Sequence, residues 1–171
     1  MPQTLIAILA MVVTTLFAFN QHKSVLNTRM GMIRQDVSMR ATGVAVDVME
    51  EIGAMAFDDA TKTGAISELS LLTYLPLTID SVDTEQLESG GADDIDDFNG
   101  LTLARTRTHG EQTVNFVARP RINYVSTDGT SIVAYATKFK RVSISVVAAD
   151  FVFPDTVRVS QVFACGSRCD W

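Results

Sequence analysis

The sequence predicts an α+β fold in which a long N-terminal α-helix packs on an antiparallel β-sheet domain. Two observations predict it. Apolar residues follow helical spacing through the first third of the chain, and short segments alternate apolar and polar residues through the last third. We expect the helix over residues 1–57, a connector with an acidic loop over 58–100, and the sheet domain over 101–171.

The helix begins with an apolar half, residues 1–21, which contains no Asp, Glu, Lys or Arg. At ~1.5 Å of rise per residue this half is about 30 Å long, close to the thickness of a bilayer core. The stretch opens with Met1-Pro2-Gln3-Thr4 rather than with the basic residues of a secretory signal peptide. We therefore interpret it as a permanent helix that lies in lipid or in a packed protein core.

The second half of the helix, residues 22–57, is amphipathic. Its apolar residues recur in steps of three and four, which places them on one stripe. The chain has no proline between Pro2 and Pro76, so one helix of roughly 55 residues, about 80 Å long, can form. The remaining chain is too small to bury such a helix along its length. We expect residues 44–57 to cover the sheet and the rest of the stripe to find partners outside the chain.

The connector carries much of the negative charge. The chain has a net charge of −6 and a pI of about 4.8, which argues against contact with nucleic acid because phosphate binding needs a basic surface. Residues 63–104 contain no Lys or Arg. The acidic loop offers clustered oxygens of the kind that calcium prefers, from Asp93, Asp94, Asp96, Asp97 and Asn99. Their spacing is not that of an EF-hand, and a solvated acidic turn is the alternative. No other cofactor is predicted.

Six short segments read as antiparallel strands: residues 101–107, 113–118, 122–126, 131–137, 142–148 and 157–163. Between the third and the fourth, Thr127-Asp128-Gly129-Thr130 is a hairpin signal. Five or six such strands with one apolar face need a cover, and the second half of the helix is the obvious candidate.

The two cysteines, Cys165 and Cys169, lie near the C-terminus. Two cysteines are too few for a structural zinc site, so we favour a local disulfide, which Gly166 would help to close. Such a bond contributes roughly 2 kcal/mol and indicates an oxidising compartment, the periplasm or the cell exterior. Free thiols in a cytosolic protein are the alternative.

The sequence contains none of the common catalytic motifs that we considered. The sequence lacks Gly-x-Ser-x-Gly, His-Glu-x-x-His, a phosphate loop and a nucleotide-binding fingerprint. We predict that the protein is not an enzyme.

The arrangement of an apolar N-terminal helix, its amphipathic continuation, an antiparallel sheet and a C-terminal disulfide resembles type IV pilins and the pseudopilins of type II secretion. The resemblance covers the layout of the whole chain, whereas only the N-terminal part is similar in sequence. In that family a peptidase removes a basic leader and the new N-terminus is methylated, which implies that Met1 is a mature, N-methylated residue. Two positions depart from the pattern. Leu5 stands where a glutamate is common, and Asn20-Gln21-His22 stands near the usual helix proline.

The resemblance implies a structural subunit of a type IV pilus-like extracellular filament or of a pseudopilus. Such a subunit lies in the inner membrane before assembly and then polymerises with its own copies through the N-terminal helices. The stripe that we expect to pack against neighbouring copies consists of Leu5, Leu9, Val12, Leu16, Leu26, Met30, Ile33 and Val37.

The alternative is a single-pass membrane-anchored extracytoplasmic domain that binds calcium or a partner. Two observations favour the filament. The stripe continues well past residue 21, although an anchor needs only the first twenty residues to be apolar. Basic residues directly after the stretch, Lys23, Arg29 and Arg34, would keep the C-terminal side of a plain anchor in the cytoplasm, in conflict with a disulfide. The leader of a pilin precursor would supply competing basic residues.

Overall fold

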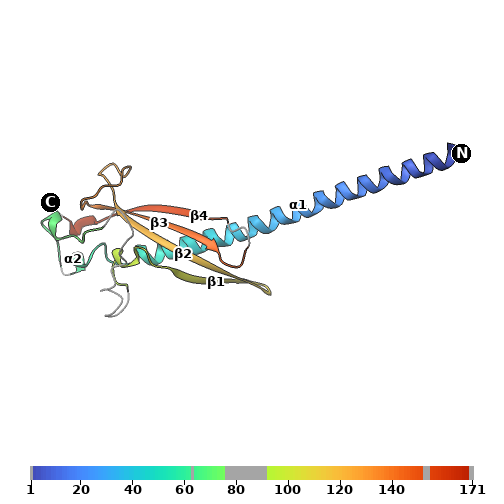
Figure 1. Cartoon of the computed structure of the whole chain (residues 1–171). Coiled ribbons are helices and arrows are strands. Elements are labelled where there is room, and N and C mark those ends of the chain that lie inside the picture. Colours follow the sequence, from blue (N-terminus) through green and yellow to red (C-terminus); the bar gives the residue numbers. More distant parts are fainter. Residues whose placement is uncertain (1, 63, 76–91, 152–154, 170–171) are drawn as a thin grey trace. The chain divides into compact units, whose positions relative to one another are not determined.

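A computed structural model describes residues 2–62, 64–75, 92–151 and 155–169 of the protein (Figure 1). The long N-terminal helix packs on a four-stranded antiparallel sheet, which confirms the predicted α+β fold. The elements in chain order are α1 (Pro2–Gly53), α2 (Asp59–Lys62), η1 (Leu69–Leu71), η2 (Asp96–Phe98), β1 (Leu103–His109), β2 (Gln112–Tyr124), β3 (Phe139–Ala148), β4 (Val157–Ala164) and η3 (Gly166–Arg168), where η marks a 3₁₀ turn.

The chain divides into two compact units, residues 1–39 and residues 40–171. The first contains the N-terminal part of α1, which is helical throughout residues 2–39. The second contains the end of α1, the sheet and the short helical turns, and it holds the hydrophobic core. The division falls inside the helix rather than at its end, so α1 belongs to both units.

The end of α1 covers one face of the sheet. Its buried side chains keep the predicted steps of three and four: Ala41, Val44, Ala45, Val48, Met49 and Ile52. The core beneath them comes from the central strands, in which every second side chain is buried: Phe116, Ala118, Ile122, Val142, Ile144 and Val146. The cover predicted over residues 44–57 is therefore confirmed as far as Ile52.

The sheet is an antiparallel meander with the strand order β1-β2-β3-β4, so each strand pairs with its neighbour in sequence and β1 and β4 form the edges. The register places Ile144 in β3 opposite Pro120 in β2 and Val159 in β4. Two residues, Gly110 and Glu111, close the first hairpin, because His109 pairs with Gln112. Gly110 has a φ of +59°, the left-handed conformation that such a turn needs.

The helix ends at Gly53, whereas the periodicity predicted that it extends to residue 57. After Gly53 the backbone tightens, since the amide of Met55 donates to the carbonyl of Ile52 at 3.1 Å. Gly53 also lies against the sheet, where a Cβ would stand 2.9 Å from the Phe163 ring. The side chain of Met55, although in phase with the stripe, is only half-buried.

Strand β2 is longer than predicted, because it runs through Pro120 and joins two segments that the sequence separates. The carbonyl of Pro120 faces away from β3 and accepts the amide of Gly100 at 3.1 Å. At this point β1 has not yet begun, because its first residue, Leu103, pairs with Ala118. The missing N–H of Pro120 therefore removes no ladder bond, which is why a proline is tolerated here.

Residues 131–137 do not form the predicted strand. Only an isolated bridge joins Val125 to Ile132, while the amide of Val125 donates to the carbonyl of Phe139 at 3.0 Å. The end of β2 thus stays with β3. The hydroxyl of Thr137 donates to the carbonyl of Val125 at 2.7 Å, and such side-chain bonds replace a ladder. The predicted turn at residues 127–130 is present, with Gly129 at a φ of +71°.

Candidate functional site

The N-terminal part of α1 presents a long apolar surface. Residues 6–33 expose large apolar side chains, and the predicted stripe is among them: Leu9, Val12 and Leu16 are 50–63% exposed, and Leu26, Met30 and Ile33 are 48–55% exposed. Val37 is half-buried. Met1 lies outside the described residues, and so does the side chain of Leu5.

The character of this surface changes along the helix. From Ile6 to Phe19 the large exposed side chains point in all directions around the helix, a pattern typical of a helix surrounded by lipid or protein. From residue 22 onward polar and basic residues such as Lys23, Arg29 and Arg34 interrupt the apolar face. The helix is long and apolar enough to cross a membrane.

The few polar side chains of the apolar half satisfy their hydrogen bonds within the helix. The Thr14 hydroxyl donates to the carbonyl of Ala10 at 3.0 Å, and the Thr15 hydroxyl donates to the carbonyl of Met11 at 2.7 Å. Neither hydroxyl therefore needs water, so a low-dielectric surrounding imposes little penalty on them. The surface is chemically suited to lipid or to other apolar helices.

The acidic loop forms a tight turn, and its carboxylates cap their own backbone. Asp94 Oδ1 accepts the amides of Asp96 and Asp97 at 2.7 and 3.2 Å. Asp97 Oδ2 accepts the amide of Asp93 at 2.8 Å. Asn99 Oδ1 lies on the sheet instead, where it accepts the amide of Ile122 at 2.9 Å. Four of the five predicted calcium ligands thus form one turn, and Asn99 fills the place beside β2 where β1 is absent.

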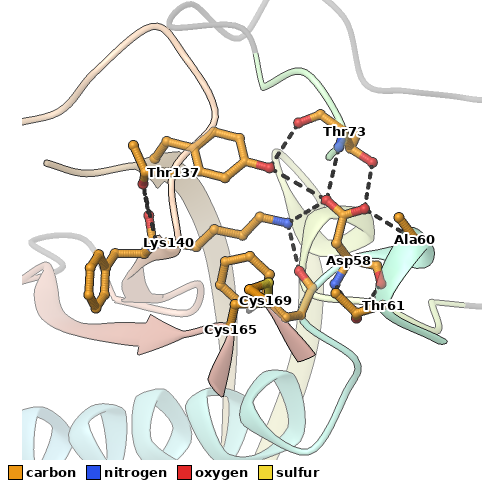
Figure 2. Close-up of a disulfide and its surroundings, with 11 residues drawn as sticks. Asp58, Ala60, Thr61, Thr73, Thr137, Lys140, Cys165 and Cys169 are labelled. Atoms are coloured by element: carbon orange, nitrogen blue, oxygen red, sulfur yellow. Dashed lines mark hydrogen bonds and ion pairs between the residues drawn. A yellow bond between two sulfur atoms is a disulfide. The ribbon is translucent and has the colours of Figure 1, made fainter. Parts of the chain in front are cut away.

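Lys140 lies beneath this turn at the centre of a buried charge cluster, which the sequence reasoning missed. Its Nζ donates to Asp96 at 2.7 Å, to Asp58 Oδ2 at 3.0 Å and to the carbonyl of Phe57 at 2.6 Å, and its side chain has no exposed surface. Figure 2 shows Lys140 reaching toward Asp58, which also accepts the amide of Thr73 at 2.9 Å. We call Lys140, Asp58 and Asp96 the lysine cluster.

Burial and charge shift the two carboxyl groups of the lysine cluster in opposite directions. Burial raises the pKa of Asp96 to about 8, against the opposing charge of Lys140. Burial also pushes the pKa of Asp58 upward, but Lys140 and the hydrogen bonds from Thr73 and Ala60 outweigh it, and the pKa lies below its ordinary value. The site therefore combines a carboxylate that is held ionised with a second carboxyl group that takes up a proton more readily than an ordinary aspartate does.

The signal for Lys140 is present in the sequence. Along residues 139–148 the buried positions are the even ones, and Lys140 is in phase with Val142, Ile144 and Val146. A lysine on the inward face of a strand needs buried acids as partners. The sequence does not show that these come from Asp58 and Asp96, which are 82 and 44 residues away.

Calcium stays a prediction. Lys140 and, at Asp93, Lys62 supply the positive charge that the prediction assigned to an ion. Asp94 Oδ2 and Asp97 Oδ1 are buried and accept no hydrogen bond, yet no group of three or more Asp, Glu, His or Cys side chains in the described part of the chain is placed to hold a metal. A higher melting temperature in calcium than in chelator would support the ion, and equal temperatures would leave the lysines as counter-charges.

Cys165 and Cys169 form the predicted disulfide, with their Cα atoms 5.8 Å apart. Gly166 between them has a φ of +66°, as a ring this short requires. The amide of Cys165 donates to the carbonyl of Lys138 at 2.9 Å, so the ring is hydrogen-bonded to the residue that precedes β3. Both cysteines are buried.

Comparisons of the chain with protein families, with curated proteins and with solved structures give no match.

Proposed function

We propose that the protein is a structural subunit of a type IV pilus-like extracellular filament or pseudopilus and polymerises through its N-terminal helix. The observation that carries this proposal is the uncovered apolar surface of α1, which continues to Ile33. Burial of one such side chain is worth roughly 1.5–3 kcal/mol, so a row of them strongly favours a partner over water.

The length of the surface favours assembly over simple anchoring. About twenty apolar residues span a bilayer, and this requirement is met before residue 22. Leu26, Met30 and Ile33 lie beyond it and are about half exposed. A second copy of the same helix, offset along its axis, offers a surface of the same chemistry. In this proposal residues 1–21 lie in the inner membrane before assembly and between neighbouring helices afterwards.

A charge at Ile33 separates the two candidate functions. Ile33→Asp places a carboxylate on the stripe beyond the membrane half, and Gln35→Asp places the same charge two residues away at an exposed polar position. We expect Ile33→Asp to remove the chain from the sheared surface-filament fraction while the chain stays in the membrane fraction. Gln35→Asp should leave both fractions unchanged.

The opposite outcomes point to the single-pass anchored binding domain. If Ile33→Asp forms filaments as well as Gln35→Asp does, the stripe beyond residue 21 has no role in assembly. Leu9→Asp and Val12→Asp, in the apolar half, should remove the chain from both fractions.

The N-terminus gives an independent test. We propose that Met1 follows a peptidase cleavage and carries an N-methyl group, as in the family that the chain resembles. Mass spectrometry of the N-terminal peptide from surface-exported protein measures this directly. An upstream sequence still attached to the exported protein would contradict processing at Met1.

A further inference from the structure

The lysine cluster brings an amine and two carboxyl groups together in a buried site that is shielded from water. Lys140 Nζ contacts Asp96 at 2.7 Å and Asp58 Oδ2 at 3.0 Å. The side chains of the three residues are exposed by 0, 3 and 1% respectively. Two aromatic rings close the space around the nitrogen, Phe57 with its centroid at 4.5 Å and Tyr124 at 5.2 Å. The amine is therefore shielded from water and lies directly against both carboxyl groups.

We propose that Lys140 and Asp96 condense into an intramolecular isopeptide bond, with Asp58 as the group that transfers the proton. The bond would join Lys140 in β3 to Asp96 in η2 and would close a covalent ring through the acidic loop and strands β1 and β2. It is a modification site independent of the filament function, because it lies wholly within residues 40–171.

The reaction balances without any further reagent. The Lys140 ammonium passes one proton to the Asp96 carboxylate, which gives an amine and a carboxylic acid. The nitrogen lone pair then attacks Cγ of Asp96, an N–C bond forms, and the carbonyl electron pair moves to oxygen. Asp58 takes a second proton from the nitrogen and delivers it to the departing hydroxyl, so the C–O bond breaks and water leaves. The third proton stays on the amide nitrogen, and Asp58 is regenerated as a carboxylate.

The surroundings favour this step in two ways. Holding the amine against the carboxyl group replaces a bimolecular encounter, and such proximity is worth large factors in rate. Burial disfavours charged groups, so exchanging the Lys140–Asp96 ion pair for a neutral amide removes two buried charges. The Asp58 carboxylate that remains keeps the hydrogen bonds from the amides of Thr73 and Ala60. The released water passes to solvent, and the aromatic walls limit its return for hydrolysis.

Asp96 rather than Asp58 is the partner because their other contacts differ. Asp58 also accepts the amides of Thr73 and Ala60 and so is held as a carboxylate, a poor target for attack. Asp96 Oδ1 accepts no hydrogen bond and lies 2.7 Å from Lys140 Nζ. Figure 2 shows Asp58 at the junction of several hydrogen bonds, the position expected of a fixed proton-transfer group.

Mass spectrometry of the full, mature chain tests the bond. We expect an intact mass below that of the disulfide-bonded sequence by one water. Asp128-Gly129 could lose the same mass by closing a succinimide, so the tryptic map decides. The expected product joins residues 63–105 to residues 139–141, without cleavage after Lys140, and its fragments place the junction at Asp96.

Matched variants show which groups react. Lys140→Arg keeps the charge but cannot form the amide and should restore the full mass, whereas Lys138→Arg, two residues earlier, should retain the bond. Asp58→Asn should lower the cross-linked fraction of freshly made protein several-fold relative to Asp59→Asn.

Two results would overturn the proposal. One is a wild-type chain of full mass whose digest shows ordinary cleavage after Lys140. The other is a cross-linked product that contains residues 41–62, since the partner would then be Asp58. Both readings come from the wild-type chain and do not depend on the folding of any variant.

Discussion

The two ends of α1 have similar apolar patterns and opposite surroundings. Val44, Val48 and Ile52 are buried under the sheet, whereas Leu26, Met30 and Ile33, which also recur at helical spacing, are about half exposed. The helical spacing of apolar residues therefore indicates that one face of the helix must be covered, but it does not indicate which molecule or segment covers that face. In residues 40–171 the cover is part of the chain, and for residues 1–39 we propose that lipid or another molecule supplies it.

The largest difference in stability is expected when the same charge is placed on the buried and on the exposed part of the stripe. Val48→Asp buries an unpaired carboxylate in the core, and we expect a loss of about 4 kcal/mol or more in the free energy of unfolding. Met30→Asp should leave the melting of the sheet domain unchanged. Circular dichroism of the two variants in detergent measures both effects. Equal destabilisation would mean that residues 1–39 belong to the same cooperative unit.

Removing the disulfide should have a medium effect that is confined to the second unit. Cys165→Ser with Cys169→Ser opens a short ring and is expected to lower the free energy of unfolding by roughly 2 kcal/mol. Denaturant unfolding of the variant and the oxidised wild type measures the difference. Non-reducing peptide mapping of residues 162–171 should first show the wild-type mass lower by two hydrogens. Complete thiol labelling without reductant would contradict both the bond and the oxidising compartment.

Glycines along α1 provide a smaller contrast. Ala at Gly43 meets no atom within 4 Å and should stabilise the helix by about 0.5–1 kcal/mol. Ala at Gly53 places a methyl group 2.9 Å from the Phe163 ring and should lower stability by about 1 kcal/mol, because the ring must move. Thermal melts of the two variants should shift in opposite directions. A stabilising Gly53→Ala would show that the helix and the sheet are less closely packed there.

The smallest effect concerns the exposed turn at residues 126–131. Hydrogen bonds from Ser126 and Thr130 lower the pKa of Asp128 to about 2. A carboxyl group with a lowered pKa adds stability that is complete above its ordinary value of 3.8 and lost as the pH falls through about 2. An NMR titration of the Asp128 side chain should show this value, and Ser126→Ala should raise it. A titration near 3.8 in the wild type would show that these hydrogen bonds do not persist in solution.

Local patterns predicted the elements that depend on local chemistry. The spacing of Ala41, Val44, Val48 and Ile52 predicts the covered helix, and alternation predicts the four strands that form. The disulfide follows from two cysteines four residues apart, which leaves no other partner in the chain. In each case the relevant neighbours are close in sequence, so a short window contains the information.

The errors arise where the deciding partner is distant. Pro120 indicated a break in β2, but Gly100 and Asn99 take the places that a first strand would occupy. The lysine cluster was missed for the same reason, because Asp58 and Asp96 are far from Lys140 in sequence. Calcium at the acidic loop stays a prediction. The candidate assembly surface lies between these cases. Its apolar character can be predicted, whereas the partner that we propose for it lies outside the chain and leaves no pattern in the sequence.

The two edge strands of the sheet are possible sites of aggregation. β1 and β4 each have a neighbouring strand on one side only. The backbone N–H and C=O groups on the other side of an edge strand can pair with the edge strand of another molecule and lead to aggregation. Arg105 and Arg107 on β1 form ion pairs with Glu51 and Asp47 of α1, and Arg158 lies on β4. Charged side chains on edge strands oppose pairing with the edge of a neighbouring molecule, so they limit aggregation through the sheet.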